Sequence, residues 1–209
     1  MQLINEPVMS HVITLYGIGG ARSLRCQWLL SELELDYEFV DESGLIGSDK
    51  LRQYHPQAKI PAAVINDVVL FESSAICNYL CDLESDKKFL AVSGTVKRAL
   101  HDQWVSFVQS EIEGYLWSNI KHKSLYPEER RVPEVIKQNI REIQAGLKVV
   151  DTALSSSNYI LGDHFSVTDI IIGWTINWAR RSDLLEGYKS LFDYLERLFQ
   201  REHCMLNPE

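Results

Sequence analysis

The segment 60–73 constrains the fold of this 209-residue chain more than any other part of the sequence. Two β-prone runs, 60–65 and 68–71, are separated by Asn66-Asp67, and a separation of two residues is typical of an antiparallel hairpin. Glu72-Ser73 follows the second run and opens a helical pattern. The segment therefore predicts two neighbouring antiparallel strands that lead directly into a helix.

Strand and helix patterns alternate in the part of the chain that precedes this hairpin. Residues 11–16 and 37–40 are β-prone, whereas 21–35 has apolar residues at a helical period. The polar stretch 41–53 is expected to hold a short helix and a loop. With the hairpin and its helix, the predicted order is β-α-β-α-β-β-α, which is that of a small α/β sandwich.

The pattern changes after residue 84. From residue 95 onward there are no convincing strands, and Pro133 fits the first position of a long helix. The amphipathic helical patterns cover residues 95–120, 133–154, 167–181 and 188–200. We therefore expect an α/β domain at 1–84, with 1–10 as a loose leader, and an all-helical domain at 95–209.

Charge and composition exclude several classes of function. The formal net charge of −8 disfavours a nucleic-acid partner, because a polyanion would be repelled. No apolar run approaches the ~18 residues needed to cross a bilayer, and the start lacks the features of a signal peptide. The cysteines form neither a CxxC pair nor a metal-ligand cluster, so we expect free thiols, no metal site and a cytoplasmic location. They are Cys26, Cys77, Cys81 and Cys204.

The helical part contains one strong local signature, the segment 166–169. Ser166 is placed to cap a helix, and Asp169 stands three residues later, which is an aspartate version of the capping box. An apolar run follows and predicts a buried central helix. We therefore interpret Asp169 as a structural residue and not as a catalytic one.

The chemistry suggested by the hairpin depends on Pro61, Glu72 and Ser73. If the bond before Pro61 is cis, the backbone N–H and C=O of the preceding residue can turn outward and pair with an extended peptide. A helix start at Ser73 favours a carboxylate, while Glu72 can hold an ammonium group. Together these groups fit a γ-glutamyl tripeptide. An edge-strand proline followed by an ordinary N-cap serine explains the same residues equally well.

The segments HPQAKIP at 55–61 and LFESSAI at 70–76 closely resemble the glutathione-binding segment of glutathione S-transferases. The segment YILGDHFSVTD at 159–169 is similar to the capping element of that family's helical domain. The resemblance extends over about residues 11–205. It implies a thioredoxin-like N-terminal domain, an all-helical C-terminal domain, a homodimer, and a bacterial-type cytosolic enzyme of detoxification.

The resemblance also implies roles for particular residues. The backbone of Ile60, with Pro61 cis, would bind the cysteinyl part of glutathione, which is the co-substrate of this family. Glu72 and Ser73 would bind the γ-glutamyl end of glutathione, and Lys59 would meet a carboxylate of glutathione. Asp102 would reach the glutathione bound by the partner subunit.

The loop after the first strand departs from the family pattern. Many bacterial relatives read Ser-Arg-Ser-x-Arg where this chain has alanine at position 21, so a frequent donor to the glutathione thiol is missing. Tyr16, Arg22 and Ser23 remain as candidate catalytic residues, and the N–H groups that open the next helix are a further source of stabilisation. Arg25 lies inside the helical pattern, where we expect it to pair with an acid or to extend past the core.

Three functional hypotheses follow. The first is a glutathione transferase that activates the thiol for attack on a small, electrophilic, partly apolar substrate, or for reduction of peroxides or disulfides. The second is a non-catalytic protein-interaction module with the same fold, which the alanine at position 21 favours. The third is a disulfide exchanger that uses Cys26, although no cysteine lies in the loop after the first strand.

Overall fold

The computed structural model describes residues 11–208, so the leader expected at 1–10 lies outside the described residues. The chain divides into two units, Met1–Ile76 and Cys77–Glu209. The division falls inside the helix α3 (Ser73–Leu83), because the second half of that helix bonds to the helix that follows it. The sequence places the boundary at 84–94 instead, and the domain limits remain a prediction.

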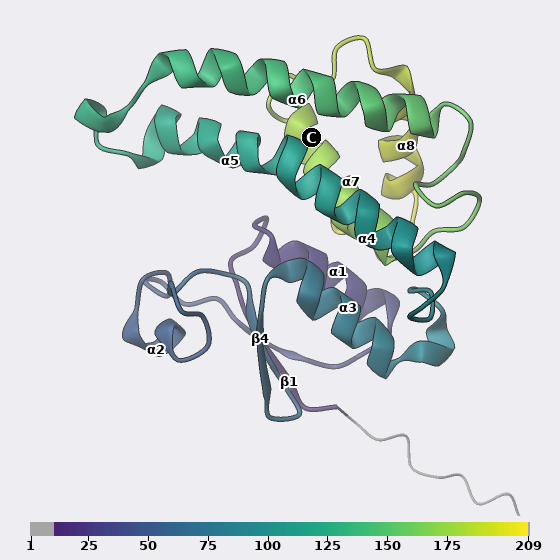
Figure 1. The fold of residues 1–209 in the computed structure, drawn as a ribbon. Helices are drawn as coiled ribbons and strands as arrows, with labels where there is room; N and C mark the ends of the chain where they lie inside the picture. Colours follow the sequence, from purple (N-terminus) through teal and green to yellow (C-terminus); the bar gives the residue numbers. More distant parts are fainter. Residues whose placement is uncertain (1–10, 209) are drawn as a thin grey trace, which may run out of the picture. The chain divides into compact units, whose positions relative to one another are not determined.

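The first unit, purple to blue in Figure 1, is built on a mixed sheet of four strands in the order β2-β1-β3-β4. Its strands are β1 (Ile13–Tyr16), β2 (Glu38–Val40), β3 (Ala62–Ile65) and β4 (Val68–Phe71). Strand β1 is parallel to β2 and antiparallel to β3, which is in turn antiparallel to β4. The helices of this unit are α1 (Ser23–Glu32), α2 (Asp49–Arg52) and the start of α3. This arrangement confirms the predicted thioredoxin-like α/β fold.

The predicted hairpin is present, and the backbone conformation of its two turn residues explains why the turn can be so short. Asn66 and Asp67 have φ values of +47° and +69°, the left-handed conformation that a two-residue hairpin turn requires. Along β1 the side chains alternate, and Ile13 and Leu15 are buried on one face of the sheet. Tyr16 projects to the opposite face, in a cluster with residues of the α2 region.

The second unit is all-helical, as predicted. The expected helix at 95–120 is present, but a π-helical turn at Gln109–Glu113 interrupts it and another, at Lys121–Leu125, extends it. The expected helix at 133–154 has the predicted bounds. The helices are α4 (Val96–Val108), α5 (Gly114–Ile120), α6 (Pro133–Leu154), α7 (Val167–Arg180) and α8 (Lys189–Phe199), with single 3-10 turns at Ser85–Lys87 and Glu128–Arg130.

The capping box predicted at the start of α7 is confirmed. Asp169 is fully buried and accepts hydrogen bonds from the backbone N–H groups of Ser166 (2.9 Å) and Ile160 (3.0 Å). The hydroxyl of Tyr194 donates to the same carboxylate at 3.1 Å. Burial raises the pKa of Asp169 to about 6, against the lowering effect of these donors. Asp169 therefore joins the start of α7 to α8 and to the preceding loop.

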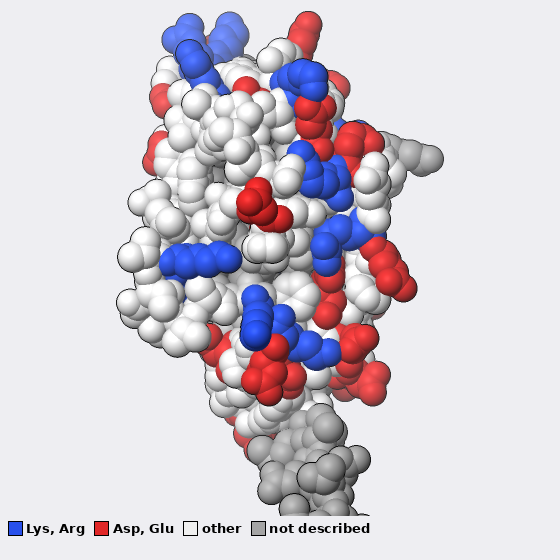
Figure 2. All heavy atoms as spheres, turned by 90° about the vertical axis from the view of Figure 1, so that its right-hand side faces the viewer, with Lys and Arg blue, Asp and Glu red and all other residues white. Residues whose placement is uncertain are grey.

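The surface carries charges of both signs. On the face shown in Figure 2, basic and acidic side chains are interspersed, and no broad field of one sign is visible there. No helix within residues 11–208 is both long enough and apolar enough to span a membrane. Over the same residues, no group of three or more histidine, cysteine or acidic side chains is arranged to hold a metal ion.

Candidate functional site

The register of the sheet brings the predicted site residues of the first unit to one edge. Tyr16, the last residue of β1, pairs with Ala62, the first residue of β3. Ala62 also pairs with Phe71, the last residue of β4. The loop after β1, the residues before β3 and the start of α3 therefore leave the sheet at the same end.

Ile60 presents its backbone N–H and C=O groups at this edge. The Ile60–Pro61 bond is cis, and β3 begins only at Ala62. Within residues 11–208, neither the N–H nor the C=O of Ile60 takes part in a backbone hydrogen bond. A donor and an acceptor on one residue can pair with an extended peptide as a neighbouring strand would. Lys59, the residue before Ile60, is exposed.

Ser73 and Glu72 stand where β4 ends and α3 begins. Ser73 is the first residue of α3, and only 1% of its surface is exposed. Glu72 is exposed and has a φ of +69°, a left-handed conformation that is uncommon for a residue with a side chain. Such backbone strain gathers at ligand sites. The N-terminus of α3 presents backbone N–H groups and the positive end of the helix dipole, which favour an anion.

Tyr16 is packed into the core of this unit. Only 7% of its surface is exposed, and its ring stacks on that of Tyr54 with a centroid distance of 4.4 Å and an interplanar angle of 20°. Burial, together with a hydrogen bond to Tyr54, raises the pKa of the Tyr16 phenol well above its ordinary value. The phenol therefore stays protonated at neutral pH.

The loop after β1 is held by Ser23. The Ser23 hydroxyl donates to the carbonyl of Ile18 at 2.7 Å and accepts from the N–H of Ile18 at 3.2 Å. A Cβ on Gly17 would lie 2.4 Å from the Ser23 Cβ, so the chain requires glycine there. The only hydroxyl hydrogen of Ser23 is used within the loop. Arg22 is partly exposed and occupies the N-cap position of α1.

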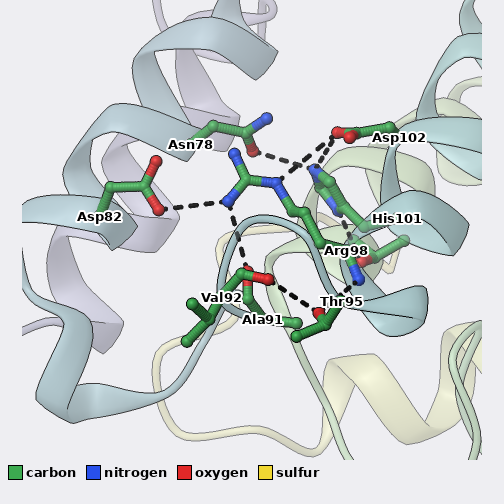
Figure 3. Close-up of polar contacts among 9 residues, drawn as sticks. Asn78, Asp82, Ala91, Val92, Thr95, Arg98, His101 and Asp102 are labelled. Carbon is green, nitrogen blue, oxygen red and sulfur yellow. Dashed lines mark hydrogen bonds and ion pairs between the residues drawn. The ribbon is translucent and has the colours of Figure 1, made fainter.

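Asp102 lies on α4, in a polar network of the helical unit (Figure 3). Its carboxylate is 3.7 Å from the Arg98 guanidinium and 4.0 Å from the His101 ring, and 60% of its side chain is exposed. Arg98 also binds Asp82 of α3 at 3.2 Å. These ion pairs account for the position of Asp102, and its contact with glutathione remains a prediction.

Two further contacts at Ser73 were missed by sequence reasoning. The Nη1 of Arg25 donates to the Ser73 hydroxyl at 3.1 Å, and the Cys26 thiol donates to the Ser73 carbonyl at 3.8 Å. Arg25 is fully buried, so of the two expectations for it the extension past the core is wrong, and its pairing with an acid remains a prediction. The signal available in the sequence was a cation at an otherwise buried position of an apolar helix.

Comparison with known proteins defines the family. The N-terminal domain of glutathione S-transferases matches residues 11–82, and their C-terminal domain matches residues 133–197. The chain therefore belongs to the glutathione S-transferase superfamily. It is 27% identical over 190 residues to glutathione S-transferase GstA of Escherichia coli O157:H7, an alignment that covers 87% of this chain and 90% of GstA.

Two other comparisons show how widely the fold is used. The crystal structure of the glutathione transferase URE2P6 from Phanerochaete chrysosporium, in complex with oxidised glutathione, has a TM-score of 0.82 with 24% identity and covers 92% of each chain. That likeness supports the fold. Elongation factor 1-gamma of Prunus avium is 26% identical over 145 residues, covering 69% of this chain and 34% of the factor.

Proposed function

We propose that the sheet edge formed by Ile60, Glu72 and Ser73 binds glutathione and that the protein is a glutathione transferase. The observation that carries this proposal is the register of the hairpin. This register aligns the N–H and C=O of Ile60, neither of which forms a backbone hydrogen bond within the described residues, with the positive end of α3 at Ser73. The family and the name of the relative GstA support the same function.

Each part of glutathione has a partner of matching chemistry in this arrangement. The cysteinyl backbone pairs with the N–H and C=O of Ile60 as an added strand. The carboxylate of the γ-glutamyl residue lies at the N-terminus of α3 beside Ser73. The ammonium group of the same residue pairs with Glu72. Lys59 is exposed before Ile60 and suits the second carboxylate, that of the glycyl end.

The thiol of glutathione must ionise to react, and its ordinary pKa is about 8.5. Among the three candidates for its stabilisation, the hydroxyl of Ser23 is used by Ile18, and Tyr16 packs against Tyr54. The placement therefore favours Arg22 and the N–H groups that open α1. The thiol loses its proton to solvent, the sulfur lone pair forms a bond to the electrophilic carbon, and a leaving group departs with its electron pair.

The rest of the proposal concerns substrate, assembly and location. The electrophile is small and partly apolar, and the reduction of peroxides or disulfides by glutathione belongs to the same proposal. The protein forms a homodimer in the cytoplasm. The net charge of −8 supports a function without nucleic acid.

A specific observation favours the second candidate, a non-catalytic interaction module. The two side chains with hydroxyls near the loop after β1 are both engaged within the protein, because Ser23 donates to Ile18 and the largely buried Tyr16 ring stacks on Tyr54. A relative that is not named as a glutathione transferase, elongation factor 1-gamma, aligns with 69% of this chain. An absence of turnover across electrophiles and peroxides, with glutathione still bound, would support this second candidate.

The binding claim is tested by calorimetric titration with glutathione. Wild type is compared with the double variant Glu72→Ala/Ser73→Ala, and Ser43→Ala serves as the control because Ser43 is exposed and is not among the residues proposed to bind glutathione. We expect binding in wild type and in the control, and none in the double variant. Equal binding in all three proteins would place glutathione elsewhere and refute the proposed site.

A further inference from the structure

The contact between Arg25 and Ser73 joins the interior of α1 to the first residue of α3. The two residues are 48 positions apart, and their side chains meet at 3.1 Å between Nη1 and the hydroxyl oxygen. Arg25 is 0% exposed and Ser73 is 1% exposed. A buried guanidinium is costly, so an apolar residue would suit this position better if packing were its only role.

The chemistry of the guanidinium determines whether the serine hydroxyl donates or accepts in this hydrogen bond. Arginine has only donors and is not deprotonated in proteins. Ser73 must therefore accept the hydrogen bond from Arg25, and its single hydroxyl hydrogen is left to point toward another acceptor. A carboxylate is an acceptor without any donor, so it is the complementary ligand group.

The position of Ser73 is fixed by a second bond from the same helix. The thiol of Cys26, the next residue of α1, donates to the Ser73 carbonyl at 3.8 Å. Side chain and backbone of Ser73 are thus both held from α1. Glu72, the residue just before it, is exposed to solvent at this helix start.

We propose that Arg25 is a positioning residue that makes Ser73 selective for the free carboxylate of the γ-glutamyl end. This inference rests on the proposed function and adds to it the origin of the selectivity. Arg25 acts through Ser73 and touches no ligand atom. A charged donor also polarises the hydroxyl that it binds, which strengthens the bond from that hydroxyl to the carboxylate.

The test compares two ligands on three proteins. Wild type, Arg25→Met and Arg25→Lys are titrated with glutathione and with γ-aminobutyryl-cysteinylglycine, which lacks only the glutamyl carboxylate. We expect Arg25→Met to bind glutathione about tenfold more weakly than wild type, equivalent to 1.4 kcal/mol, with unchanged affinity for the analogue. Lysine at this position also donates without accepting, so Arg25→Lys should recover part of the loss.

Equal weakening for both ligands, or for neither, would overturn the proposal, because a purely structural role does not distinguish them. If Arg25→Met does not fold, Arg25→Gln carries the same comparison, since its amide oxygen can accept the Ser73 hydrogen and remove the selectivity. A wild type that binds no glutathione refutes the proposed function together with this inference. A wild type whose binding is lost in Ser73→Ala, but whose selectivity is unchanged by Arg25 variants, refutes this inference alone.

Discussion

His101 makes the stability of the helical unit depend on pH, and its buried position determines that acid lowers this stability. Its ring is 0% exposed, with Nδ1 2.8 Å from the Thr168 hydroxyl and Nε2 3.0 Å from the Asn78 side-chain oxygen (Figure 3). Burial lowers the pKa of His101 from 6.5 to about 4. Arg98 also lowers it, and the nearby carboxylates, above all Asp102, oppose the shift.

The size of the effect follows from proton linkage. Between the two pKa values the unfolded chain binds more protons than the folded one, so acid lowers the free energy of unfolding. With a folded-state pKa of about 4 against 6.5, lowering the pH from about 8 to about 5 costs about 2 kcal/mol. Little of this contribution changes above about pH 7.5, because His101 is then neutral in both states.

The assay is urea-induced unfolding of wild type and His101→Gln at both pH values. Four of the five tryptophans lie in the helical unit, so their fluorescence mainly reports that unit. Glutamine does not titrate, and other groups cancel in the difference between the two proteins. We expect wild type to lose about 2 kcal/mol relative to His101→Gln between about pH 8 and about pH 5. The exposed His164→Gln is the control. A difference between wild type and His101→Gln that does not change with pH would contradict the lowered pKa of His101.

Three further predictions concern single residues. Asp169→Ala should lower the free energy of unfolding by about 2 kcal/mol or more, because buried donors lose their acceptor. The control, Asp163→Ala at an exposed position, should change the free energy of unfolding little. Equal stabilities of the two variants in thermal unfolding would contradict this prediction. Glu72→Gly should be about 1 kcal/mol more stable than Glu72→Ala, because only glycine relaxes the positive φ, while both bind glutathione equally weakly in titrations. Arg22→Ala should slow the conjugation of glutathione more than Tyr16→Phe does, since Tyr16 is only 7% exposed and its ring stacks on Tyr54. The reverse order in steady-state rates would assign stabilisation of the thiol to Tyr16.

Regular elements could be predicted because local patterns determine them. Pro133 and the amphipathic period predicted α6 with its observed bounds, and the spacing from Ser166 to Asp169 predicted the capping box. The π-helical turn at Gln109–Glu113 was not predicted, because one extra residue in a turn leaves no composition signal.

The sequence predicts those parts of the candidate site whose residues lie close together along the chain. The Ile-Pro and Glu-Ser pairs lie at the two ends of one hairpin, so the hairpin register alone brings them together. The contact of Arg25 with Ser73 joins residues 48 positions apart and depends on how α1 packs in its unit. The use of the Ser23 hydroxyl by Ile18 depends on the exact path of a loop, which residue types do not define.

The most direct test of the central claim is to follow the backbone amide resonances of the isotope-labelled protein by NMR while glutathione is added. We expect the amides of Ile60 and Ser73 to shift with a common binding curve, while that of Val69, in the interior of β4, changes little. Shifts confined to other parts of the chain, or no saturable shift at Ile60, would contradict the claim that this sheet edge binds glutathione.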